Sequence, residues 1–82
     1  MTRLDNGPEV ITEVDARELR CPLPLLRAKQ ALRTIDPGQA VRVLATDAGS
    51  VRDFRAFADL AGHGLEREDR PDGVYVYILV KS

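Results

Sequence analysis

The sequence contains few cysteine, histidine and aromatic residues. Its 82 residues include one cysteine, Cys21, one histidine, His63, and no tryptophan, and aromatic residues make up 5%. A single cysteine cannot close a disulfide within the chain, so no disulfide framework stabilises the fold. One cysteine and one histidine also cannot supply the four ligands of a Cys/His zinc site. We therefore expect no metal site and no cofactor.

The chain also lacks an excess of charge and any long apolar segment. Twelve Lys and Arg residues against thirteen Asp and Glu residues leave a net charge of −1. Tight non-specific binding of nucleic acid needs a clustered cationic excess, so we expect no direct contact with nucleic acid. No segment approaches the roughly 18 consecutive apolar residues of a membrane span, and the N-terminus has no signal-peptide core. We expect a cytoplasmic monomer without membrane contact, whose thiol stays reduced.

The apolar periodicity predicts one domain at residues 10–82, preceded by a flexible polar tail at residues 1–9. Two helices are expected, one that opens at Pro22 or Pro24 and reaches Ile35, and one that ends at residue 61 before a glycine-rich exit. The expected strands are residues 10–14, 40–45, 65–68 and 74–80. This βαβαββ order predicts an α/β (α+β) two-layer sandwich, with two helices on one face of a four-stranded mixed sheet.

The second helix carries two further predictions about its start. Ser50 is expected to be its N-cap, with Asp53 three residues later as the partner in a capping box. Near the end of the chain, Tyr75 and Tyr77 alternate with valines and are expected to share one face of the sheet and to pack across strands. His63 lies between two glycines, where a loop position is the simpler interpretation.

Cys21 stands where a loop enters the first predicted helix. The unpaired N–H groups and partial positive charge of a helix N-terminus favour a thiolate, and cysteines in such positions can have pKa values of roughly 3.5–7.5. Arg20 would add positive potential beside the sulfur. A buried small hydrophobic residue is the alternative interpretation of a lone cysteine, but the charged flank favours an exposed, reactive sulfur.

The prolines on either side of Leu23 stiffen the entry to this helix. Pro22 and Pro24 each lack an N–H group, so few donors are left near the sulfur, with the amides of Leu23 and Leu25 the leading candidates. A restrained loop would hold the sulfur in place at low entropic cost.

The segment 15–24, Asp-Ala-Arg-Glu-Leu-Arg-Cys-Pro-Leu-Pro, resembles the signature of the TusA (SirA/YedF-like) family of sulfur-carrier proteins. In that family an Asp, a Gly-Leu pair and a Cys-Pro-x-Pro motif occur at this spacing. The resemblance extends over residues 10–81, and the family fold agrees with the predicted element order. It implies that Cys21 accepts sulfane sulfur as a persulfide. One position departs from the pattern, because Glu18 stands where the family usually has glycine.

The resemblance also implies partners. A cysteine desulfurase or a rhodanese-like protein would donate the sulfur, and a thiol-bearing protein would accept it. Within the family, such relays serve tRNA thiolation, molybdenum-cofactor enzyme maturation or sulfur oxidation, and the sequence does not select among them.

Four further residues are candidates for supporting or docking roles. Asp15 is expected to fix the loop before the cysteine through an Asx-type hydrogen bond. The resemblance makes Arg27, Asp47 and Arg52 candidates for contacts with the sulfur or with a partner. In the simpler interpretation, the aspartate caps a loop and both arginines are solvated.

Two other functional classes stay open at this point. One is a non-catalytic regulatory or docking module in which Cys21 is only structural. The other is a thiol redox sensor, which is oxidised to a sulfenic acid or to an intermolecular disulfide.

Overall fold

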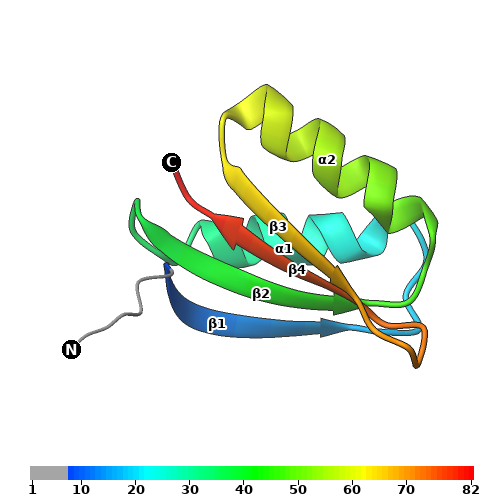
Figure 1. Cartoon of the computed structure of the whole chain (residues 1–82). Helices are drawn as coiled ribbons and strands as arrows, with labels where there is room; N and C mark the ends of the chain where they lie inside the picture. The colour runs from blue at the N-terminus through cyan, green and yellow to red at the C-terminus, as the bar shows by residue number, and fades with distance from the viewer. Residues whose placement is uncertain (1–7) are drawn as a thin grey trace.

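The computed structural model describes residues 8–82 and confirms the predicted order of elements (Figure 1). The expected tail at residues 1–9 falls largely outside this range, and Glu9 already belongs to the first strand. The six elements are β1 (Glu9–Ala16), α1 (Leu23–Leu32), β2 (Gln39–Ala45), α2 (Gly49–Ala61), β3 (Gly64–Asp69) and β4 (Tyr75–Val80). No helix within the described range is long and apolar enough to cross a membrane.

The four strands form one mixed sheet in the order β1-β2-β4-β3. Strands β1 and β2 are parallel, as a crossover through α1 requires. Strand β4 is antiparallel to both β2 and β3. Since β1 and β2 run in the same direction, their carboxyl ends meet at one edge of the sheet, where their arrowheads lie close together in Figure 1.

Both helices pack against the same face of this sheet, as predicted. Alternate residues of β2 and β4 point into one core with residues of α1 and α2, because successive side chains of a strand point to opposite faces. Phe54 of α2 and Tyr77 of β4 are fully buried, with ring centroids 4.1 Å apart and nearly parallel planes. The stack fixes α2 on the sheet. Tyr75 lies on the same face and is partly buried against the core.

The start of α2 differs from the prediction. The N-cap residue is Ala48, and the Ser50 hydroxyl instead forms a buried hydrogen bond of 2.7 Å with the hydroxyl of Tyr77. The predicted N-cap and capping box at Ser50 are therefore wrong. Because the helix begins earlier, Ser50 faces the sheet, where it supplies the partner that a buried tyrosine hydroxyl requires. The predicted left-handed exit is confirmed at Gly62, which has a φ of 78°.

Helix α1 begins at Leu23, between the two possible starts, and ends at Leu32 rather than at Ile35. The Leu23 amide donates to the carbonyl oxygen of Arg20 at 2.8 Å. The prediction that this amide is a free donor for the sulfur is therefore wrong. Pro24 is buried and Ile35 joins the core from the turn that follows the helix.

Candidate functional site

Cys21 lies in the loop between β1 and α1, at the edge where β1 and β2 end. Its side chain is exposed, and it precedes a cis peptide bond to Pro22. Two hydrogen bonds tie this loop to the segment after β2. The amide of Glu18 donates to the Thr46 hydroxyl at 3.0 Å, and the amide of Cys21 donates to the Asp47 carboxylate at 3.3 Å. The parallel pairing of β1 with β2 thus brings together two loops that are distant in sequence.

The Asp47 carboxylate joins the cysteine loop to the start of α2. The oxygen that accepts from Cys21 also accepts from the amide of Gly49, at 3.1 Å. Asp47 therefore satisfies one of the free N–H groups at the helix N-terminus, in addition to holding the loop. Gly49 leaves space for this arrangement, since a Cβ there would lie 2.9 Å from the same Asp47 oxygen and 3.2 Å from the Cys21 Cβ. Sequence reasoning singled out Asp47 but missed Gly49.

The Cys21 thiol makes its hydrogen bond to Asp53, in the first turns of α2. The thiol donates to the Oδ2 atom of the carboxylate. Sequence reasoning gave Asp53 only the role of a capping-box partner, so this contact was missed. A sequence signal existed, because Asp53 opens a helix whose N-terminus follows β2, and β2 ends beside the cysteine loop. That signal could be used only once β1 and β2 were known to be neighbours.

The groups around the Cys21 sulfur raise its pKa, whereas the sequence predicted a lowered pKa. The hydrogen bond to Asp53, partial loss of water and the negative charges of Asp53 and Asp47 raise the pKa of Cys21 above its ordinary value of 9.0. Arg52 acts in the opposite direction and only partly offsets them. The expectation of a pKa lowered by the N-terminus of α1 is therefore wrong. Two carboxylates from the α2 side prevail over the few amides of a proline-flanked helix start.

The loop before the cysteine has an unusual backbone at Glu18, which has a φ of 70°. This left-handed region favours glycine, because a Cβ there crowds the backbone. The glycine usual at this position in the TusA family would adopt it without that crowding. Glu18, which stands where the family usually has glycine, therefore adopts a backbone conformation that favours glycine.

Asp15 stabilises the first turn of the same loop, as predicted. Its carboxylate accepts from the backbone amide of Arg17 at 3.2 Å and from the guanidinium at 2.9 and 2.8 Å. The hydrogen bonds to Arg17 lower the pKa of Asp15 to about 2. The amide contact between residues two apart is the expected Asx-type hydrogen bond.

The other residues singled out in the sequence are exposed or lie away from the sulfur, and one of them acts on it through its charge. Arg20, Arg27 and Arg52 are exposed, and Arg52 acts on the sulfur through its charge. Pro22 is the N-cap residue of α1 and is also exposed. His63 lies in the loop after α2, where its Nδ1 atom accepts from the amide of Ser82 at 3.1 Å.

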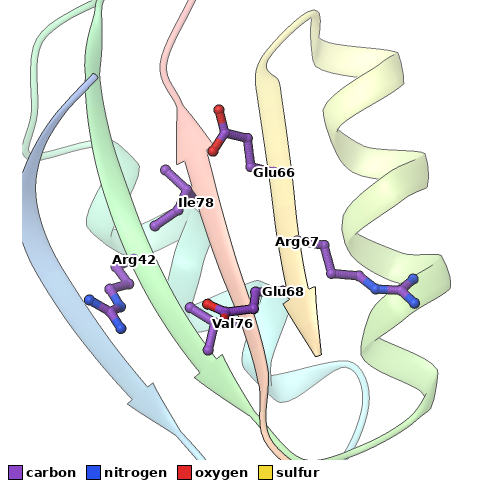
Figure 2. A pocket seen from close by; sticks show the side chains of 6 residues that line it. All are labelled: Arg42, Glu66, Arg67, Glu68, Val76 and Ile78. Atoms are coloured by element: carbon purple, nitrogen blue, oxygen red, sulfur yellow. The ribbon is translucent and has the colours of Figure 1, made fainter. Parts of the chain in front are cut away.

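A hollow of about 250 Å³ lies on the opposite face of the sheet (Figure 2). Its lining comes from β2, β3 and β4 and consists of Arg42, Glu66, Arg67, Glu68, Val76 and Ile78. None of the residues around Cys21 contributes to it. The Cys21 thiol therefore stands on an exposed loop, apart from this hollow.

The fold and the site define a small α+β domain with one exposed thiol, held between two loops and bonded to a carboxylate. The family described as "Sulfurtransferase TusA" matches residues 12–81. The sulfur carrier protein TusA of Allochromatium vinosum is 46% identical over 70 residues, which cover 85% of this chain and 92% of that protein. The TusA protein of Pseudomonas aeruginosa is 34% identical over 69 residues, with 84% and 87% covered.

A solved structure gives the same result at the level of the fold. The SirA-like protein of Desulfitobacterium hafniense superposes with a TM-score of 0.78 at 28% identity, covering 85% of this chain and 96% of that one. The chain belongs to the TusA family, as its resemblance in sequence indicated.

Proposed function

We propose that this protein is a sulfur carrier, which holds sulfane sulfur as a persulfide on Cys21 and relays it between partner proteins. The observation that carries the proposal is the exposed thiol of the chain's single cysteine, on the loop where β1, β2 and α2 meet. Relatives that match most of the chain are named sulfur carrier proteins. An exposed thiol on a surface loop can be reached by the cysteine of a second protein.

The proposed loading step is a thiol exchange that balances without an oxidant. The sulfur of Cys21 attacks the terminal sulfur of a donor persulfide, R–S–SH, as its thiolate. A new S–S bond forms on Cys21, and the S–S bond of the donor breaks. The donor leaves as R–SH with the proton that Cys21 gave up. The products are Cys21–S–SH and the free donor thiol, so sulfane sulfur changes carrier with no net oxidation or reduction.

Unloading requires a second protein. With one cysteine in the sequence, Cys21 cannot release its sulfur by forming an internal disulfide. A thiol-bearing acceptor must attack the terminal sulfur of the persulfide. We propose a cysteine desulfurase or a rhodanese-like protein as the donor. The route that the sulfur then takes would be tRNA thiolation, molybdenum-cofactor enzyme maturation or sulfur oxidation.

The two alternative classes have less support. A purely structural cysteine is expected to be buried, whereas Cys21 is exposed. A redox sensor also uses an accessible cysteine, but the relatives that match most of the chain are named sulfur carrier proteins and not redox sensors.

The proposal is tested by incubating the protein with a cysteine desulfurase and free cysteine and then measuring its intact mass. We expect the mass of one added sulfur atom, removed by a reductant and absent in Cys21→Ser. No added sulfur with any persulfide donor, or an addition that persists in Cys21→Ser, would falsify the proposal.

A docking role for Arg27 is tested in the same assay. Arg27→Ala should slow loading from the desulfurase but leave loading from a small-molecule persulfide unchanged. Arg33→Ala, an exposed arginine beyond the last turn of α1, is the matched control and should affect neither. Equal rates for all three proteins with the desulfurase would exclude Arg27 from the docking surface.

A further inference from the structure

We propose that Asp53 is a positioning residue, which holds the Cys21 thiol protonated and keeps the resting carrier unreactive until a partner engages the carboxylate. The inference rests on the proposed function, since it assigns Asp53 a role in the chemistry of the same sulfur. It goes beyond that function by stating which residue controls when the sulfur can react.

The position of Asp53 is fixed by the packing of α2. The next residue, Phe54, is fully buried and stacks on Tyr77, so the first turns of the helix cannot rotate freely. Asp53 itself is partly buried. Within residues 8–82, its carboxylate accepts the hydrogen bond from the thiol of Cys21 and forms no other hydrogen bond or ion pair. This carboxylate is thus aimed at the sulfur and is otherwise unengaged.

The surrounding charges favour the neutral thiol. A thiolate on Cys21 would face the carboxylate of Asp53 from α2 and that of Asp47 from the preceding loop. Arg52 is the opposing charge from α2. Loss of the thiol proton would replace a hydrogen bond with a contact between two anions. The geometry therefore makes deprotonation costly as long as Asp53 stays free to accept.

A carrier with a single cysteine benefits from this arrangement. A free thiolate reacts with oxidants and with disulfides, and this chain has no second cysteine to reverse such a reaction internally. A docking partner that places a cationic group beside Asp53 would engage the carboxylate and weaken its bond to Cys21. The sulfur would then become reactive at the interface where the transfer takes place.

The decisive measurement is the rate at which iodoacetamide alkylates Cys21 across neutral and alkaline pH. Because the chain has one cysteine, intact mass follows this site alone. We expect Asp53→Asn to lower the midpoint of the pH profile and to increase the rate at neutral pH several-fold. Each unit by which a pKa falls gives about tenfold more thiolate at a pH well below it. Asp59→Asn, a substitution on the same helix at a residue bonded to Arg55, should leave the profile unchanged.

An unchanged midpoint in Asp53→Asn, or a higher one, would overturn the inference. A merely structural role for Asp53 would lower stability without moving this midpoint. If Asp53→Asn fails to fold, the wild-type profile and that of Asp53→Ser decide the question. A wild-type midpoint at or below the ordinary value of 9.0 contradicts the proposed control of the thiol.

A second readout separates this inference from the proposed function. A small-molecule persulfide brings no docking group, so Asp53→Asn should load sulfur from it faster than the wild type at neutral pH. Equal or slower loading would contradict the inference. If neither protein gains sulfur from any donor, the proposed function fails, while the alkylation profile still tests the control of the thiol by Asp53.

Discussion

The two helices begin close to the same sulfur atom, but their N-termini are built differently. Helix α1 follows the cysteine directly and has prolines at its start, and its N-cap residue, like that of α2, forms no side-chain cap. Helix α2 begins 28 positions after the cysteine, and the Asp47 carboxylate accepts from its Gly49 amide. The side chain of Cys21 bonds to α2, through Asp53, and not to the start of its own helix.

This difference shows that neighbours in sequence need not set the chemistry of a residue. Helix α1 lies next to the cysteine in the chain, whereas the carboxylates of Asp53 and Asp47 raise the pKa of the sulfur. A positive helix terminus is outweighed when ionised side chains lie closer to the group than the free amides do.

The largest effect is expected where α2 is attached to the sheet. Ser50→Ala leaves the buried hydroxyl of Tyr77 without its partner, which should lower the free energy of unfolding by about 1–3 kcal/mol. Urea denaturation measures the change. The double variant Ser50→Ala/Tyr77→Phe removes both hydroxyls and should lose less than the sum of the two single variants. Strict additivity would show that the two hydroxyls do not interact.

A smaller effect is expected in the loop that leads to α1. Glu18→Gly should raise the free energy of unfolding by about 1 kcal/mol, because glycine adopts a φ of 70° without crowding from a Cβ. Arg20→Gly, in the same loop but without a positive φ, is the control and should not stabilise the protein. Equal stability changes in both variants would contradict an effect specific to the left-handed conformation.

The smallest effect concerns the ion pair at the start of the same loop. Arg17→Ala should raise the pKa of Asp15 from about 2 toward its ordinary value of 3.8, as measured by NMR titration of the carboxyl group. Since folding lowers this pKa, the contribution of Asp15 to stability is present above pH 3.8 and is lost as the pH falls toward 2. Arg17→Ala should therefore flatten the pH dependence of unfolding in that window. An unchanged Asp15 titration would show that the pair does not persist in solution.

Much of the fold could be predicted because its signals are local. The alternation of β4 marked a strand with Tyr75 and Tyr77 on one face, and Gly62 marked the end of α2. Asp15 could be assigned to its loop because its hydrogen-bond partner is two residues away. Each of these features depends on the chain within a few residues, where periodicity and turn chemistry operate.

The start of α2 could not be predicted from the local pattern. Ser50 has the residue type and position of an N-cap, but Tyr77 of a distant strand requires its hydroxyl. Gly49 looked like part of a loop, although the cysteine packs against it. Both positions are decided by contacts with residues remote in the sequence.

The sequence by itself determined that this protein has one thiol, placed by prolines at the entry to a helix, in a βαβαββ domain of the TusA family. Only the tertiary structure decided the state of that thiol. Parallel pairing of β1 with β2 brings the start of α2 to the cysteine loop, and Asp53 then accepts a hydrogen bond from the thiol. The physical reason is that the pKa of a group follows the charges within a few ångströms of it, and chain folding chooses which charges those are.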